Sequence, residues 1–125
     1  MPALAEWHEA HSSVIASLEP DDRLPQHAAL EVYSVLTRLP APLRLDPADA
    51  ADTLRARFPP PYLVLPSDAH DDLVGRLSRA GVRGGSVYDG LVGATASAQG
   101  AVLLTRDERA TVTYRALGVA HERLR

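Results

Sequence analysis

The sequence has 125 residues, of which 46% are hydrophobic and 23% charged, and these values indicate one soluble globular domain spanning residues 1–125. It contains no cysteine, which excludes disulfide frameworks, cysteine-ligated zinc and thiol catalysis. With a formal net charge of −3, no long apolar run and no signal-peptide pattern, the chain is expected to be a cytoplasmic domain without a broadly basic surface and without a membrane span.

The first half of the sequence predicts helices separated by proline-rich turns. Segment 3–18 is rich in alanine and leucine and has no internal proline or glycine, which is typical of a helix. A second helix is expected over 26–38, where apolar residues share one arc. A third is expected from Asp46, a suitable N-cap residue, to about Phe58, after which three consecutive prolines follow.

The second half predicts strands that alternate with helices. The short apolar run 62–65 lies between prolines and is typical of a buried strand, and Ser67 is suited to cap the helix that follows. Alternating strands and helices imply parallel βαβ units with helices on both faces of the sheet. The expected order is strand 62–65, helix 67–80, helix 87–99, strand 101–105, helix 108–116 and a last strand beginning at about 118.

Three acidic residues occupy positions where a carboxylate has either a structural or a chemical role. Glu31 lies at the edge of the apolar arc of its helix, where it could instead pair with Arg38 or remain solvated. Asp89 falls in the first turn of a helix, which a negative charge stabilises. Asp107 follows a strand by two residues and could simply be an N-cap.

Taken together, these three acids predict an acidic pocket. Glu31, Asp89 and Asp107 lie at helix N-terminal or strand C-terminal positions, which can converge at one edge of a parallel sheet. Mg²⁺ prefers oxygen ligands and retains several waters, and an open acidic pocket suits metal-assisted phosphodiester hydrolysis. Crowded carboxylates should also raise at least one pKa in the cluster.

Three stretches resemble PIN-domain ribonucleases, most closely the toxins of VapBC toxin–antitoxin pairs. They are residues 27–40 (HAALEVYSVLTRLP), 83–96 (RGGSVYDGLVGATA) and 103–107 (LLTRD), and they span nearly the whole chain in the family's order. The resemblance implies a three-layer α/β/α sandwich with a mostly parallel central sheet. It also implies an acidic pocket that binds Mg²⁺ or Mn²⁺ and cuts RNA, a VapB-like antitoxin as partner, and a homodimer.

The resemblance assigns roles to individual residues. Glu31, Asp89 and Asp107 match three of the family's four acids, and are therefore the expected catalytic and metal-binding residues. Thr105 matches the hydroxyl residue that often precedes the last acid, and would orient Asp107 by hydrogen bonding. The expected phosphate contacts to RNA are the arginines nearest to the acids in sequence, which are Arg38, Arg83 and Arg106.

The sequence departs from the family at its beginning. PIN domains open with a strand that supplies Asp-x-Ser/Thr, whereas this sequence begins with Met1 and Pro2 just before the expected first helix. We therefore expect a metal pocket that lacks one carboxylate, with weak activity in the chain as written. The alternative is a non-catalytic, degenerate PIN module that binds an antitoxin or a dimer partner.

Other motifs give weaker predictions. His8 and His11 have a spacing that one helix face can use for zinc, although helix-surface histidines are the better interpretation without a third ligand. Gly84 and Gly85 precede a helix and could contact a phosphate through backbone N–H groups. The sequence has neither the Gly-x-x-x-x-Gly-Lys pattern of a nucleotide-binding P-loop nor the Gly-x-Ser-x-Gly elbow of a serine hydrolase.

Overall fold

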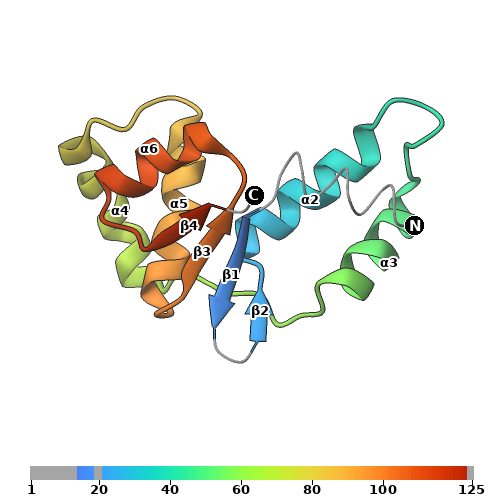
Figure 1. Ribbon diagram of the computed structural model, residues 1–125, viewed down its shortest axis with the longest axis horizontal. Coiled ribbons are helices and arrows are strands. Elements are labelled where there is room, and N and C mark those ends of the chain that lie inside the picture. Colours follow the sequence, from blue (N-terminus) through green and yellow to red (C-terminus); the bar gives the residue numbers. More distant parts are fainter. Residues whose placement is uncertain (1–13, 19–20, 124–125) are drawn as a thin grey trace.

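The computed structural model describes residues 14–18 and 21–123, which form a sheet with helices packed around it (Figure 1). Because residues 1–13 lie outside this part, so do His8, His11 and most of the first expected helix. In chain order the elements are β1 (Val14–Leu18), β2 (Asp21–Arg23), α2 (Gln26–Arg38), α3 (Pro47–Arg57), α4 (Ser67–Ala80), α5 (Ser86–Ala98), β3 (Val102–Thr105), α6 (Glu108–Ala116) and β4 (His121–Arg123).

The five helices from α2 to α6 confirm the sequence predictions to within about one residue at each end. Asp46 caps α3 as expected, because its Oδ1 accepts a hydrogen bond from the backbone N–H of Asp49 at 3.0 Å. Gly81 ends α4 in the left-handed conformation, with φ of 73°, which favours glycine. The cap assigned to Ser67 was wrong, because Pro66 holds the N-cap position and Ser67 is the first helical residue.

Two predicted elements differ in the structure. Residues 14–18 form a strand and not the end of a helix, because Val14 and Ile15 belong to a segment that pairs with β3 on one side and with β2 on the other. Residues 62–65 form no strand. Only Leu63 makes a parallel bridge, to Pro25, because the prolines that flank this run have no N–H group to donate to a ladder.

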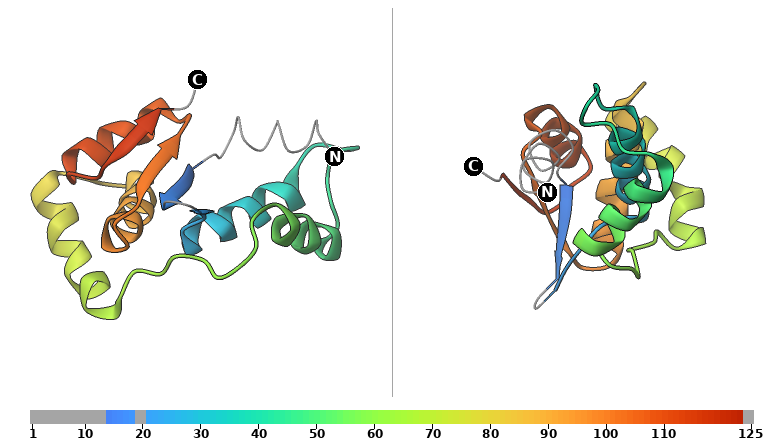
Figure 2. Two further views of the ribbon diagram at one scale, coloured as in Figure 1. Left: turned by 60° about the horizontal axis from the view of Figure 1, so that its bottom comes forward. Right: turned by 90° about the vertical axis from the view of Figure 1, so that its right-hand side faces the viewer.

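The four described strands form one mixed sheet in the order β2-β1-β3-β4. The pair β3–β4 is parallel, with Leu103 opposite His121, whereas β1 runs antiparallel to both β2 and β3. The α/β class is therefore as expected, but the described sheet is less parallel than predicted, because the segment assigned to a helix supplies the reversed strand. In the right-hand view of Figure 2, α2, α3 and α4 lie on one side of β1, and β4 lies on the other.

Helix α5 lies at the centre of the fold and contacts α2, α4, α6 and β3. It can approach these neighbours closely because its buried face is built of small residues. A Cβ atom on Gly93 would lie 3.2 Å from Cδ1 of Tyr114 in α6, and one on Gly90 would lie 2.6 Å from Cδ2 of Leu77 in α4. Asp89 in the first turn of α5 lies close enough to Asp107, at the N-terminus of α6, for the charge of Asp107 to act on it.

The main hydrophobic core lies between α2, α3, α5, α6 and β3, and includes the fully buried Leu36, Leu103 and Tyr114. Burial of such side chains contributes about 1.5–3 kcal/mol each to folding. None of the helices in the described part of the chain combines the length and the apolar character that a bilayer-spanning segment needs.

Candidate active site

Asp89 lies in the first turn of α5, where its side chain is partly buried. Its pKa is raised from the ordinary 3.8 to about 6. Burial is the largest cause, and the negative charges of Asp107 and Glu31 add to it. The positive charges of Arg109 and His27 oppose this change. The charges of Asp107 and Glu31 thus reach Asp89 and act in the predicted direction, although burial is the larger cause of the raised pKa.

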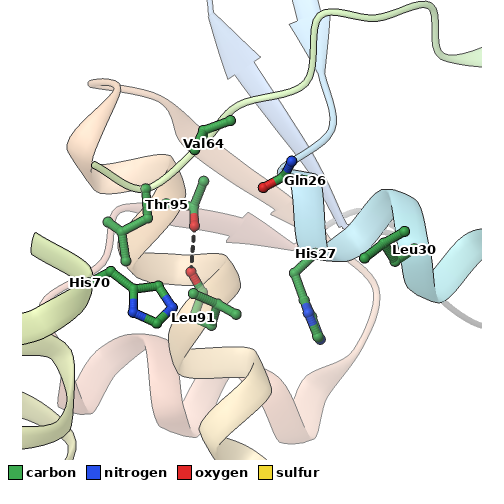
Figure 3. Close-up of a pocket in the computed structure, with 8 residues that line it drawn as sticks. Gln26, His27, Leu30, Val64, His70, Leu91 and Thr95 are labelled. Atoms are coloured by element: carbon green, nitrogen blue, oxygen red, sulfur yellow. Dashed lines mark hydrogen bonds between the residues drawn. The ribbon is translucent and has the colours of Figure 1, made fainter. Parts of the chain in front are cut away.

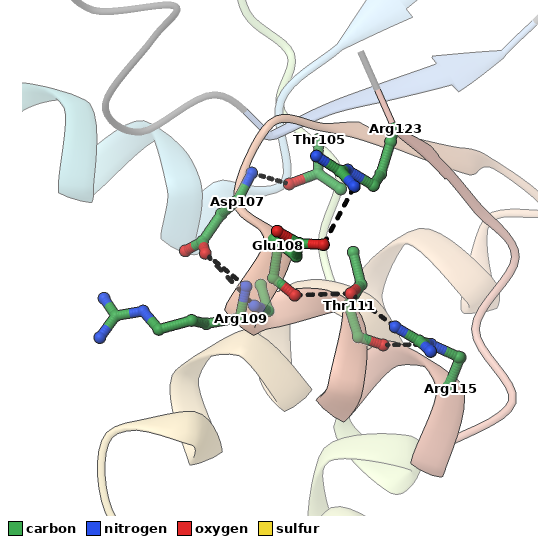
Figure 4. Close-up of polar contacts among 8 residues, drawn as sticks. Thr105, Asp107, Glu108, Arg109, Thr111, Arg115 and Arg123 are labelled. Carbon is green, nitrogen blue, oxygen red and sulfur yellow. Dashed lines mark hydrogen bonds and ion pairs between the residues drawn. The ribbon is translucent and has the colours of Figure 1, made fainter. Parts of the chain in front are cut away.

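Asp107 is held at the N-terminus of α6 by backbone hydrogen bonds (Figure 4). Its Oδ1 accepts from the N–H groups of Arg109 at 3.0 Å and Ala110 at 3.3 Å. The fully buried Thr105 accepts the N–H of Asp107 on its Oγ1 at 3.0 Å. Thr105 thus fixes the backbone of Asp107, and capping fixes its carboxylate, so the N-cap interpretation is confirmed and leaves Oδ2 for a ligand.

Glu31 lies near the start of α2 and pairs with a histidine one turn earlier. Its Oε1 is 2.9 Å from Nε2 of His27, and the Glu31 side chain is 49% exposed. The His27 ring stacks on the Tyr88 ring of α5, with centroids 5.3 Å apart and planes 8° from parallel. The pairing of Glu31 with Arg38 is not found, because Arg38 lies seven residues along the helix, or about 10 Å.

Tyr114 of α6 is fully buried, and it lies close enough to the three acids for their charges to act on it. Within the described part of the chain, its hydroxyl has no hydrogen-bond partner. Burial raises the pKa of this phenol well above its usual range, and the negative charges of Asp89, Asp107 and Glu31 act in the same direction. Tyr114 therefore stays neutral and presents an O–H group to the acidic region.

The donor set fits a hard divalent cation held mainly through water. Among the residues that the structure describes, no group of three His, Asp or Glu side chains is close enough to form a ligand cage. Mg²⁺, however, usually keeps several waters and takes one or two carboxylates. A cation would also offset the repulsion that raises the pKa of Asp89.

Of the three arginines predicted to contact RNA, two lie close in sequence to Asp107 or Asp89, and the third lies at the far end of α2. Arg106 directly precedes Asp107, and Arg83 lies in the loop before α5, and both are exposed. Arg38 is also exposed, at the last turn of α2. Since His27 in the first turn of α2 contacts α5, Arg38 lies at the end of α2 that is further from Asp89.

Sequence reasoning missed three residues of this site. His27 could have been found from its spacing, because it precedes Glu31 by four residues on the same helix face. Arg109 follows Asp107 by two residues, but only the fold brings its charge close to Asp89. Tyr114 gives no signal of its own, because an aromatic residue in an amphipathic helix usually belongs to the core.

Comparison with known proteins gives matches over nearly the whole chain. The family described as PIN domain matches residues 3–116. Ribonuclease VapC40 of Mycobacterium tuberculosis is 45% identical over 118 residues, which cover 94% of this chain and 88% of that protein. Ribonuclease VapC27 of the same species is 45% identical over 120 residues, covering 95% of this chain and 87% of that protein. No solved structure gives a significant match.

Proposed function

Because the chain belongs to the PIN domain family, we propose that it is a metal-dependent endoribonuclease toxin of a type II toxin–antitoxin pair, which hydrolyses RNA phosphodiester bonds. The observation that most supports this proposal is that two acids, at the start of α6 and in α2, act on a third acid in α5. The charges of Asp107 and Glu31 both raise the pKa of Asp89. The relatives named above, with which it shares 45% identity, are both called ribonucleases.

In the proposed reaction, Glu31, Asp89 and Asp107 hold Mg²⁺ or Mn²⁺, directly or through water. When bound, the cation lowers the pKa of a water molecule and offsets charge on the scissile phosphate. His27 orients Glu31 through their contact of 2.9 Å. Thr105 fixes the position of Asp107 through the backbone N–H of that residue. Arg83, Arg106 and Arg38 contact RNA phosphates outside the reacting bond.

The test is cleavage of single-stranded RNA in Mg²⁺ or Mn²⁺ by the wild-type chain and by Glu31→Gln, Asp89→Asn and Asp107→Asn. We expect each substitution to lower the rate by more than about 100-fold, since even residues that merely support a metal ligand contribute about 10–100-fold. Asn caps helices as well as Asp does, so Asp107→Asn should leave α6 intact.

Glu108→Gln is the matched control. Glu108 neighbours Asp107 and pairs with Arg123 at 3.1 Å, but it does not act on the pKa of Asp89. Its rate should stay within about twofold of wild type, because an exposed ion pair contributes at most about 1 kcal/mol. Equal rates for all three acid variants and for Glu108→Gln would refute the assignment of the site.

The second candidate is a non-catalytic PIN module that binds an antitoxin or a dimer partner. It is favoured by the lack of a three-residue ligand group among the described residues. The two candidates differ in their response to metal. A ligand that binds only the folded chain raises its melting temperature. We expect Mn²⁺ to stabilise wild type more than Asp89→Asn, whereas the module would show neither this difference nor RNA cleavage.

We further propose a VapB-like antitoxin as partner, a homodimer as the assembly, and the cytoplasm as the place of action. Val74 on α4 and Val112 on α6 support a partner surface, because they are 74% and 65% exposed. Light scattering of the purified chain measures the oligomeric state, and co-purification with the product of an adjacent gene tests for the antitoxin. A monomer under all conditions would refute the homodimer.

A further inference from the structure

A pocket opens between the N-terminal turns of α2 and α4, beside the acidic site (Figure 3). Gln26, His27 and Leu30 of α2 form one wall, and His70 of α4 forms the other. Leu91 and Thr95 of α5 lie between these walls, next to residues 64–65. The pocket therefore combines apolar surface with two imidazole rings and one side-chain amide.

Two polar side chains in this pocket are available to a ligand. The Thr95 hydroxyl donates to the carbonyl of Leu91 at 2.7 Å, so its hydrogen is already used. Within the described residues, by contrast, neither the Gln26 amide nor the His70 ring makes a hydrogen bond. An amide and an imidazole each offer both a donor and an acceptor, which is the combination that the edge of a nucleobase presents.

The pocket also borders a preformed stack of flat rings. Tyr88 covers one face of the His27 ring and is itself 55% exposed. The His27 ring also lines the pocket, so one ring belongs both to the stack and to the pocket wall. A third flat ring placed there would extend the stack, and RNA bases that are not paired stack on aromatic and imidazole rings in this way.

His27 connects this pocket to the acids, because its Nε2 lies 2.9 Å from Glu31 and its ring lines the pocket. We propose that the pocket binds one nucleobase of single-stranded RNA, adjacent to the phosphate held at the acidic site. This inference rests on the proposed function and adds a base-recognition site to it. The base stacks against His27, and Gln26 and His70 bind its polar edge.

The test measures binding, not cleavage, so that it can fail independently of the proposed ribonuclease activity. The probes are fluorescent single-stranded RNA homopolymers of equal length and an equally long ribose phosphate chain that has no bases. All proteins contain Asp89→Asn to prevent cleavage, and fluorescence anisotropy gives the dissociation constants. His70→Ala is compared with Ser78→Ala, which alters an exposed residue of the same helix outside the pocket.

We expect His70→Ala to weaken binding of at least one homopolymer by about 5- to 100-fold, the range found for one base contact, and to leave the baseless chain unaffected. Ser78→Ala should change neither. Tyr88→Ala should weaken binding in the same way, and Tyr88→Phe, which keeps the stacked ring, should restore it. Equal effects on base-bearing and baseless chains, or no effect on either, would overturn the inference. Failure of RNA cleavage by the wild-type chain would instead refute the proposed function.

Discussion

At the residue scale, the most informative group is the carboxylate of Asp89, because it is destabilised in its charged form by both burial and its neighbours. Keeping this carboxylate close to Asp107 and Glu31 lowers the free energy of unfolding, and such costs are common at functional sites. The same repulsion is what a divalent cation would remove. Under the proposed function, folding stability and metal binding would therefore be coupled through this one side chain.

The unfolding free energy of the metal-free chain should fall as the pH rises from about 4 to about 6. The pKa of Asp89 is about 6 in the folded chain against an ordinary 3.8, so the folded state binds more protons in this interval and loses that advantage above it. Thermal unfolding followed by circular dichroism measures the effect. Asp89→Asn, which is neutral throughout, should melt progressively higher than wild type across this interval, and a constant difference would contradict the pKa.

A second residue-scale prediction concerns the Tyr114 hydroxyl. A buried polar group without a partner costs about 1–3 kcal/mol, so Tyr114→Phe should leave the melting temperature unchanged or raise it. Tyr114→Ala is the contrasting variant and should cost about 3–5 kcal/mol, because it removes a fully buried ring. A clear loss of stability in Tyr114→Phe would reveal a hydrogen bond to this hydroxyl.

At the element scale, α5 packs closely against α4 and α6, because its glycines leave room for side chains of these two helices. Gly90 faces Leu77 so closely that a methyl group there would lie 2.6 Å from Cδ2 of that leucine. No helix propensity explains a glycine at this point, since glycine costs about 1 kcal/mol relative to alanine in a helix. The close packing of Gly90 against Leu77 explains the glycine.

Gly90→Ala should therefore destabilise the chain by about 1–3 kcal/mol through overpacking. The control is Gly75→Ala in α4, where the nearest atom is the guanidinium of Arg79 at 3.3 Å, at the end of a flexible side chain. That substitution should stabilise by up to about 1 kcal/mol. Urea unfolding of both variants measures the difference, and equal stabilities would show that α5 tolerates a wider separation.

The elements also show what the sequence could and could not predict. Helices α2 to α6 were predictable because their caps, prolines and apolar spacing are local, as the Asp46 cap of α3 illustrates. Strand β1 was not, because its strand conformation depends on pairing with β3, more than 80 residues away along the chain. The three acids were predicted from their positions in the sequence and from the resemblance, whereas the effects of Arg109 on Asp89 and of the acids on Tyr114 depend on tertiary packing.

At the scale of the whole molecule, a chain with a net charge of −3 must bind a polyanion through local arginines. Replacing Arg83, Arg106 or Arg38 with alanine should reduce the slope of log binding constant against log salt by about 0.7 each for single-stranded RNA. Arg55→Ala, an exposed arginine on α3, is the control and should leave the slope unchanged. If all four variants had the same slope as wild type, these arginines would not contact phosphate.

The contact between Gly93 and Tyr114 has a consequence for the choice of ion. A Cβ atom on Gly93 would lie 3.0 Å from Cγ2 of Val119 and 3.2 Å from Cδ1 of Tyr114, so an alanine at this position should push α6 away from α5, and with it Asp107 away from Asp89. Mg²⁺ needs oxygens at about 2.0–2.1 Å, whereas Ca²⁺ accepts about 2.3–2.6 Å and a looser geometry. Gly93→Ala would act as a spacer between the two helices, and isothermal titration should find its ionic selectivity moved from Mg²⁺ toward Ca²⁺. Under the proposed function, Gly93 would then influence which cation size fits between Asp89 and Asp107, although it supplies no ligand atom.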